Sequence, residues 1–147
     1  MKIIMVCTGN TCRSPMAEAL MQRALTNRGL TSITVLSGGT SAHPGSHISA
    51  NAAAQLIRMG LDLRRHRAMN IYDMPLNGAL VLCMTDAHLR AVKRIDPTAN
   101  AHTLMAYAGL PDQVDDPFGM GPATYERCAL QMQRAIDIIA NKLKEGM

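Results

Sequence analysis

The chain has 147 residues and a net charge of +4. This length suits one domain with its own core, and we predict that the domain covers residues 1–147. Apolar residues make up 48% of the chain, which excludes a disordered protein. The positive charge suits an acidic ligand but is too small and scattered for a nucleic-acid-binding protein, which would also need more stacking aromatic residues.

The cysteines and the apolar runs predict a cytoplasmic protein without a membrane segment. The first apolar run is too short for a secretory signal region, and no run approaches the roughly 20 residues that cross a bilayer. Free thiols in a reducing compartment are therefore expected. A metal site is not expected, because Cys7 and Cys12 have no second pair of ligands at a suitable spacing. The cysteines are Cys7, Cys12, Cys83 and Cys128.

The first third of the chain predicts two strands and two helices. Residues 2–6 form a continuous apolar run, which is typical of a buried strand. A helix is predicted from about Pro15 to Gly29, with Glu18 complementing the positive end of the helix dipole. Further elements are predicted over residues 31–36, a β-branched strand, and 47–59, an amphipathic helix.

The rest of the chain continues this alternation. We predict a strand over 79–84, a helix from a Thr85 cap to about Lys93, a short strand over 102–104 and a helix from Pro122 to about Lys144. The pattern predicts a three-layer α/β domain, in which a four-stranded parallel sheet has helices on both faces. Ligands bind such sheets at the carboxyl ends of the strands, so the loop after the first strand is the first place to look for a site.

That loop has the features of an anion-binding site. A tight loop that ends in a helix can direct several backbone N–H groups into one concavity. Gly9 and Asn10 tolerate the positive φ that such a curl requires. The same field favours the thiolate form of Cys7, and Ser14 can donate a hydrogen bond to it. The loop reads Cys7-Thr8-Gly9-Asn10-Thr11-Cys12-Arg13-Ser14-Pro15.

Arg13 gives this loop a specific chemistry. Its planar fork of donors matches two oxygens of a phosphoryl group, which a lysine would not do. A thiolate at the floor and a guanidinium at the rim define a phosphoryl-transfer site. The alternative is a buried cysteine at a strand end and a surface arginine that caps a helix. The run from Cys7 to Pro15, between an apolar strand and an amphipathic helix, favours the site.

A phosphoryl-transfer site also needs an acid, because the leaving group must be protonated as its bond to phosphorus breaks. Asp112, Asp115 and Asp116 cluster in a loop bounded by proline and glycine. Loops at the rim of a site are where mobile acids lie. The pattern alone does not choose among the three, and a merely solvated acidic loop is the alternative.

The run from Val6 to Glu18 resembles the signature loop and first helix of the low-molecular-weight protein phosphatases. The segment from Ser37 to Thr40 is similar to the stretch after their second strand, although Gly38 replaces the usual alanine. Residues 80–85 resemble their third strand, and the segment from Asp116 to Gly119 their acid loop. The resemblance covers nearly the whole chain and implies a cysteine-dependent phosphatase that needs no cofactor.

The resemblance also implies roles for individual residues. Cys7 would be the nucleophile that forms a phosphocysteine intermediate, Arg13 would bind phosphate, and Asp116 would be the general acid and then the general base. Cys12 would be a second thiol that pairs reversibly with Cys7 and protects it from over-oxidation. The implied phosphate-binding residues are Thr8, Gly9, Asn10, Thr11, Cys12, Arg13 and Ser14. The implied supporting network consists of Asn10, Ser14, Ser37 and His66.

Two positions favour the branch of this family that acts on phosphoarginine. Tyrosine-directed members often have isoleucine at the position of Thr11 and tyrosine at that of Phe118. A threonine hydroxyl can accept a hydrogen bond from a guanidinium or hold the attacking water, and isoleucine can do neither. The alternative is a tyrosine-directed or broad enzyme. The expected partners are therefore proteins that carry phosphoarginine or phosphotyrosine.

Two other functions fit the sequence less well. An arsenate reductase of this fold needs downstream resolving cysteines, but Cys83 lies in a predicted buried strand and Cys128 on the last helix. A module that only binds phosphoproteins would not need Cys7, Arg13 and Asp116 together.

Overall fold

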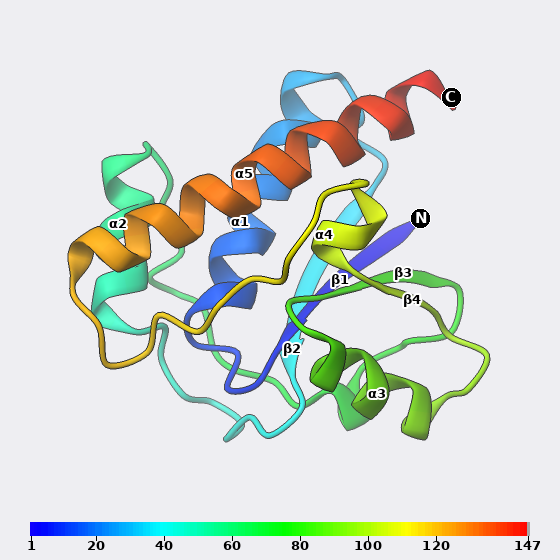
Figure 1. Ribbon diagram of the computed structural model, residues 1–147, viewed down its shortest axis with the longest axis horizontal. Coiled ribbons are helices and arrows are strands. Elements are labelled where there is room, and N and C mark those ends of the chain that lie inside the picture. The colour runs from blue at the N-terminus through cyan, green and yellow to red at the C-terminus, as the bar shows by residue number, and fades with distance from the viewer. Residues whose placement is uncertain (147) are drawn as a thin grey trace.

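Four short apolar segments form one parallel sheet, seen edge-on at the centre of the molecule (Figure 1). The structure is a computed structural model that describes residues 1–146, so Met147, the last residue of the predicted domain, lies outside the described residues. The strands follow the order β2-β1-β3-β4, and all three pairings are parallel. Their bounds are β1 Lys2–Cys7, β2 Thr34–Gly39, β3 Ala79–Cys83 and β4 Asn100–Thr103.

Helices cover both faces of this sheet, which confirms the predicted three-layer α/β architecture (Figure 1). The long helix α5 crosses over α1 and α2 on one face, and α3 lies on the other. The helices are α1 Arg13–Asn27, α2 Ala50–Arg58, α3 Asp86–Ile95, α4 Leu104–Tyr107 and α5 Pro122–Glu145, together with a 3₁₀ turn, η1 Ile71–Asp73.

The alternation of side chains along β1 creates the two apolar layers. Successive residues of a strand point to opposite faces. Ile3 and Met5 therefore pack with α1 and α5, whereas Ile4 and Val6 pack on the side of α3. All four side chains are completely buried. Methionines take much of the volume that aromatic side chains would otherwise fill, because Met16, Met21, Met84 and Met132 are also fully buried.

The N-terminus of α1 differs from the prediction. The helix begins at Arg13, two residues before Pro15, so that the last residues of the loop already belong to its first turn. Glu18 is therefore too far along the helix to complement its positive end, and that prediction was wrong. Its carboxylate instead accepts a hydrogen bond from the Ser37 hydroxyl at 2.6 Å.

The second strand is displaced by three residues from its prediction. It spans 34–39 instead of 31–36, because its bounds follow the pairing with β1, in which Lys2 lies opposite Thr34 and Cys7 opposite Gly39. Pairing thus outweighs the β-branched composition that suggested the earlier start. The shift brings Ser37 and the two glycines after it beside the loop that follows Cys7.

The later elements follow their predictions closely. Thr85 caps α3, and α5 extends from Pro122 to Glu145. The second predicted helix is shorter, because Ser49 caps it and it ends at Arg58. The short strand predicted over 102–104 occupies 100–103, since the Thr103 side chain caps the four-residue helix α4 at that point.

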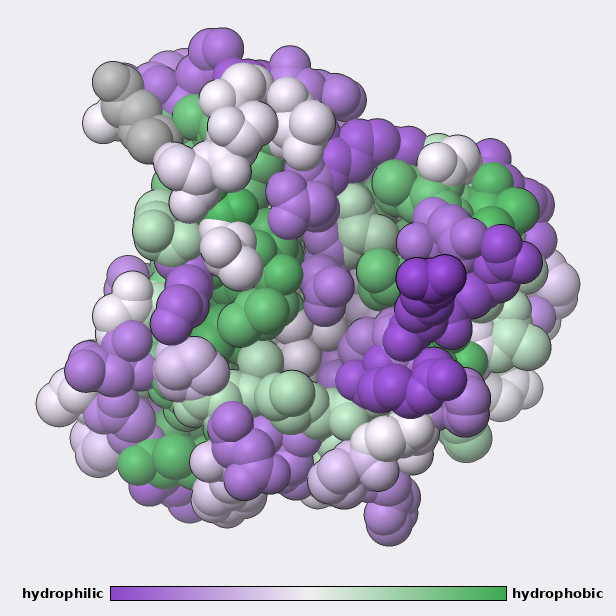
Figure 2. Space-filling view, turned by 180° about the vertical axis from the view of Figure 1, so that it is seen from behind, coloured by the Kyte–Doolittle hydropathy of each residue, from purple (hydrophilic) through white to green (hydrophobic). Residues whose placement is uncertain are grey.

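The surface is largely hydrophilic when seen from behind, with apolar residues gathered in a hollow on the left of the view (Figure 2). Arg64, Arg65 and Arg67 are exposed, as the interpretation of their segment as a basic solvated surface predicts. Within residues 1–146, no helix combines the length and the apolar composition needed to cross a bilayer.

Candidate active site

The loop between β1 and α1 curls at the carboxyl edge of the sheet. Asn10 adopts a φ of 57°, in the left-handed region that asparagine tolerates better than most residues. Gly9 does not use the same freedom, because its φ is not positive. A Cβ on Gly9 would meet the Thr11 hydroxyl at an ordinary 3.4 Å, so the loop does not require glycine there.

The loop encloses a cavity of about 240 Å³ together with the segment that follows residue 114. Cys7 and Arg13, at the two ends of the loop, are 3% and 4% exposed. Every residue that lines the cavity is one that the sequence predicted for the site. They are Cys7, Thr8, Gly9, Thr11, Cys12, Arg13, Asp116 and Phe118. Asn10 and Ser14, predicted to bind phosphate, are instead buried behind the loop.

Arg13 connects the loop between β1 and α1 to the segment that carries Asp116. Its Nη1 donates to the carbonyl oxygen of Val114 at 2.9 Å, and its Nη2 lies 3.7 Å from the Asp116 carboxylate. The backbone N–H of Val114 in turn donates to the carbonyl oxygen of Met84, directly after β3. The segment that carries Asp116 is thus fixed to the first residue of α1 and to the residue that follows β3.

Of the three candidate acids, only Asp116 lines the cavity. Its side chain is 54% exposed, and its Oδ1 accepts the backbone N–H of Phe118 at 3.1 Å. The Phe118 side chain is 74% exposed at the rim. Asp112 and Asp115 lie elsewhere in the segment, and Asp112 adopts a positive φ of 72° at its turn. Of the three, Asp116 alone shares a cavity with Cys7 and Arg13.

A chain of hydrogen bonds runs behind the loop from Cys7 to Glu18. The Cys7 Sγ lies 2.9 Å from the Ser14 hydroxyl, as predicted. The Asn10 amide nitrogen donates to Ser14 at 2.8 Å and to Ser37 at 3.0 Å. Ser37 then donates to Glu18. Glu18 was not predicted as a member of this network, since its sequence position suggested only a dipole partner.

The groups at the two ends of this hydrogen-bonded network fix the direction of each hydrogen bond in it. A backbone N–H, that of Met69, donates to the Asn10 Oδ1 at 2.9 Å, so the amide NH₂ must face the serines. A carboxylate only accepts, so the proton of Ser37 points to Glu18. Ser14 accepts from Asn10, and its own proton is left for Cys7 at 2.9 Å or for a more distant carbonyl at 3.4 Å. The network therefore presents a donor to the sulfur.

His66 and Glu18 complete the network electrostatically. The His66 Nε2 lies 2.7 Å from the Asn10 carbonyl oxygen, which can only accept, so the ring donates and braces the loop. Burial raises the pKa of Glu18 above its usual value. The hydrogen bond from Ser37 and the charge of His66 partly oppose that rise.

The second thiol of the loop has two partners that the sequence analysis missed. The Cys12 Sγ lies 3.3 Å from the Ser49 hydroxyl and 3.3 Å from the Tyr125 hydroxyl. Burial and the contact with Cys12 raise the pKa of Tyr125 to about 12. Tyr125 stands in the first turns of α5, more than a hundred residues from Cys12, so no local pattern indicates the contact.

His88 was also missed, because it was considered only as a metal ligand. Its Nε2 lies 2.8 Å from the Thr8 hydroxyl, and its Nδ1 accepts the backbone N–H of Thr85 at 3.1 Å. Burial, reinforced by the positive charge of Arg13, lowers the pKa of His88 to about 4. The signal in the sequence was the predicted Thr85 cap, since a side chain three residues after a cap can return to it.

The other two cysteines do not line the cavity. Cys83 lies within β3, and burial raises its pKa to about 12. Burial likewise raises the pKa of Cys128 to about 12, and its Sγ lies 3.9 Å from the Asp115 carbonyl oxygen. All four cysteines are free thiols. In the part of the chain that the structure describes, no three His, Cys, Asp or Glu side chains could hold a metal ion together.

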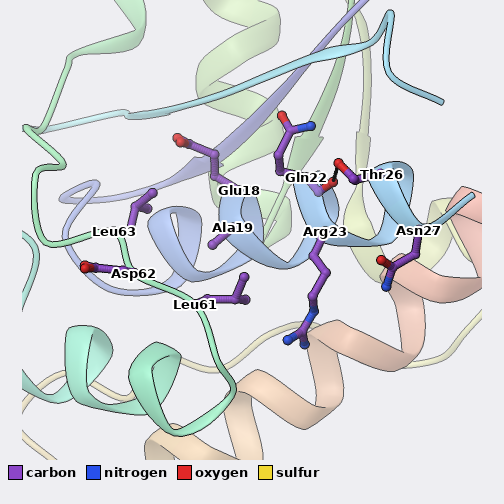
Figure 3. A pocket seen from close by; sticks show the side chains of 9 residues that line it. All are labelled: Glu18, Ala19, Gln22, Arg23, Thr26, Asn27, Leu61, Asp62 and Leu63. Atoms are coloured by element: carbon purple, nitrogen blue, oxygen red, sulfur yellow. Dashed lines mark hydrogen bonds between the residues drawn. The ribbon is translucent and has the colours of Figure 1, made fainter. Parts of the chain in front are cut away.

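A second, larger cavity of about 290 Å³ lies along α1 (Figure 3). Leu61, Asp62 and Leu63 form one wall, and the outer side of α1 from Glu18 to Asn27 forms the other. It contains neither a thiol nor a histidine. We therefore place the candidate active site in the smaller cavity, where Cys7, Arg13 and Asp116 meet.

Comparisons with known proteins give one family match and several similar proteins. The family described as "Low molecular weight phosphotyrosine protein phosphatase" matches residues 2–147. The chain is 33% identical to a protein-arginine-phosphatase of Geobacillus stearothermophilus, over 97% of this chain and 96% of that protein. It is also 33% identical to the low molecular weight protein-tyrosine-phosphatase PtpB of Staphylococcus epidermidis, over 97% and 99%. The solved structure of a YwlE mutant from Bacillus subtilis superimposes with a TM-score of 0.91 at 32% identity, covering 98% of this chain and 99% of that one.

Proposed function

Because the chain belongs to the low-molecular-weight protein phosphatase family, we propose that it removes phosphoryl groups from phosphoarginine in proteins. The observation that carries this proposal is the convergence of Cys7, Arg13 and Asp116 on one cavity that has Thr11 in its wall. The proposed domain is residues 1–147, supported by the family match over 2–147. The four free thiols support a reducing, cytoplasmic setting.

In the first proposed step, the Cys7 thiolate attacks phosphorus and the bond to the leaving nitrogen breaks. Arg13 and the N–H groups of the loop stabilise the charge on the equatorial oxygens. The Asp116 carboxyl donates its proton to the departing nitrogen, which leaves a phosphocysteine and a neutral guanidine. The Ser14 hydroxyl supports the reactive form of Cys7 through the 2.9 Å contact.

In the second step, water attacks the phosphocysteine and the sulfur–phosphorus bond breaks. The Asp116 carboxylate accepts a proton from this water, which returns Asp116 to its acid form and Cys7 to its thiolate. Inorganic phosphate then leaves the cavity. Because 54% of the Asp116 side chain is exposed, water can reach the carboxylate.

Thr11 supports phosphoarginine as the substrate. Its side chain lines the cavity, where a hydroxyl can bind guanidine nitrogens or the attacking water, and an isoleucine would fill the space with apolar surface. A phosphotyrosine phosphatase is the second candidate, and the tyrosine-phosphatase relative at equal identity supports it. Among residues 1–146, the structure gives an arsenate reductase no accessible resolving cysteine, because Cys83 and Cys128 are buried and do not line the cavity.

The decisive experiment measures phosphate release from matched peptides that carry phosphoarginine or phosphotyrosine, with Cys7→Ser as the blank. We expect kcat/KM to be higher for phosphoarginine, and Thr11→Ile to shift the ratio toward phosphotyrosine. A wild-type preference for phosphotyrosine would leave the family assignment intact and reject phosphoarginine as the substrate. Release that persists in Cys7→Ser would reject Cys7 as the nucleophile.

Asp116→Asn tests the proposed acid. A guanidine anion is very basic, so this leaving group must be protonated, whereas p-nitrophenolate departs without help. We expect the variant to lose about 100-fold or more in kcat on the phosphoarginine peptide and clearly less on p-nitrophenyl phosphate. Asp112→Asn is the matched control, because Asp112 lies in the same segment but does not line the cavity. Turnover of the peptide by Asp116→Asn at the wild-type rate would contradict the assignment.

A further inference from the structure

The His88 ring is held behind the cavity in one tautomer. Its Nδ1 accepts the backbone N–H of Thr85 at 3.1 Å, and a nitrogen that accepts carries no proton of its own. The remaining proton must therefore sit on Nε2. The ring is buried, with 5% exposed. Burial and the nearby charge of Arg13 lower its pKa to about 4, so the ring is neutral at physiological pH.

The Nε2 proton is directed at Thr8, the residue that follows the nucleophile. The Thr8 Oγ1 lies 2.8 Å from Nε2 and accepts this hydrogen bond with one lone pair. The second lone pair and the hydroxyl proton remain. No other hydrogen bond among residues 1–146 uses this hydroxyl. Thr8 is exposed and lines the cavity beside Thr11 and Phe118.

A hydroxyl fixed in this way favours a polar leaving group. The guanidine of phosphoarginine carries N–H donors around its plane, whereas the ring of phosphotyrosine presents only C–H groups at its edge. A site built to hydrogen-bond its substrate discriminates against one that leaves the polar group unpaired. Fixing the rotamer beforehand also lowers the entropy cost of binding.

We propose that Thr8 is a second specificity residue, which accepts a hydrogen bond from the guanidine of phosphoarginine, and that His88 is the positioning residue that orients it. This inference rests on the proposed function, since it takes phosphoarginine as the substrate. His88 does not touch the substrate itself. It acts through the Thr8 hydroxyl, and its ring is held in turn by the cap of α3.

The test compares kcat/KM for a phosphoarginine peptide with that for p-nitrophenyl phosphate, whose leaving group has no N–H. Thr8→Val removes the hydroxyl at nearly constant volume. We expect kcat/KM of Thr8→Val to fall more on the peptide than on p-nitrophenyl phosphate, by a further factor of about 10 or more. Thr8→Ser, which keeps a hydroxyl, should recover most of this ratio.

His88→Asn tests the positioning role. The asparagine side chain can still accept the Thr85 N–H, so the cap is kept, but it is too short to reach Thr8. We expect kcat/KM to fall selectively on the phosphoarginine peptide, as in Thr8→Val. The double variant of Thr8→Val and His88→Asn should show no additional fall, because His88 acts through Thr8. Thermal midpoints of all variants separate this effect from unfolding, since partial unfolding lowers kcat/KM equally for both substrates.

Each contrary result is distinct. An equal loss on both substrates in Thr8→Val would overturn Thr8 as a specificity residue. Additive losses in the double variant would overturn the positioning role of His88. A wild-type enzyme that does not turn over phosphoarginine would overturn the proposed function, and this inference with it, before any variant is made. When the wild-type enzyme does prefer phosphoarginine, either of the first two results would overturn the inference alone and leave the proposed function standing.

Discussion

The single proton of Ser14 is directed by groups that lie far from it in the sequence. Asn10 occupies its acceptor side, and Met69 holds the Asn10 amide in the required orientation. The Ser14 proton is therefore left for the Cys7 sulfur, 2.9 Å away, or for the more distant Gly38 carbonyl oxygen at 3.4 Å. We therefore expect Ser14 to support the charged form of Cys7, the proposed nucleophile, although Ser14 does not line the cavity itself.

Ser14→Ala should therefore lower kcat by about 10- to 100-fold, the usual effect of losing a hydrogen bond to a charged group. Phosphate release under saturating p-nitrophenyl phosphate measures this effect. Ser41→Ala is the matched control, because its side chain is exposed and only its backbone N–H contacts the loop. A Ser14→Ala enzyme with the wild-type kcat would show that the sulfur does not depend on this donor.

At the same scale, local spacing predicted the central residues of the candidate site but not their distant partners. Cys7 and Arg13 share one loop between a strand and a helix, and both line the cavity as expected. Spacing alone did not separate Asp116 from its neighbours; the family resemblance chose it, and of the three candidates only Asp116 lines the cavity. Tyr125 and Glu18 went unrecognised, because their contacts join residues that the chain brings together only after folding.

Among the elements, β2 shows how pairing places functional residues. Its composition predicted a strand that ends at Leu36, but the register with β1 extends it to Gly39. The extension carries Ser37 to the network and places Gly39 against the loop. A prediction from composition cannot find this register, because strand bounds depend on the partner strand as much as on the residues themselves.

The two glycines at the end of β2 should respond differently to alanine. A Cβ on Gly39 would lie 2.4 Å from the Thr8 carbonyl oxygen and 3.1 Å from the Asn10 nitrogen, both backbone atoms of the loop between β1 and α1. A Cβ on Gly38 would lie 2.3 Å from the Met74 sulfur, which belongs to a flexible side chain that can move away. An added methyl group would therefore displace the loop backbone at Gly39 but only a side chain at Gly38.

Gly39→Ala should therefore destabilise the fold by about 2 kcal/mol or more and strongly reduce phosphate release, since the loop itself must shift. Gly38→Ala should cost about 1 kcal/mol or less and stay active, which agrees with the alanine that the family usually has at this position. Urea denaturation and kcat measured on both variants check the contrast. Equal destabilisation in the two variants would contradict this view of the loop packing.

At the scale of the whole molecule, the alternation of apolar strands and amphipathic helices was enough to predict the three layers. It could not predict how α5 returns across the molecule to place Tyr125 on the loop thiol, or how the segment before it reaches Arg13. Those placements depend on helix packing between distant parts of the chain, for which local periodicity carries no signal. The cavity therefore depends on the assembled fold, although its lining residues were predicted from sequence motifs.

His88 links this assembly to the pH dependence of stability. Its pKa is about 4 in the folded chain, because burial and Arg13 disfavour the charged ring, whereas an exposed histidine titrates near 6.5. Between these values the unfolded chain binds a proton that the folded chain does not, so the free energy of unfolding falls as the pH is lowered from about 6.5 to about 4. The raised pKa of Glu18 acts in the opposite direction over part of this range.

Comparing the wild type with His88→Asn isolates this contribution, because Glu18 is present in both proteins and cancels. We expect the unfolding free energy of the wild type, measured relative to that of His88→Asn, to fall by about 2 kcal/mol between pH 7 and pH 4. This figure allows for partial solvent screening. The difference should level off about one pH unit below 4, where the folded chain also binds the proton. Urea denaturation at pH 7, 5.5 and 4 measures it. Parallel pH profiles would mean that the folded chain protonates His88 as easily as the unfolded chain, and that the ring is not held neutral between Thr85 and Thr8.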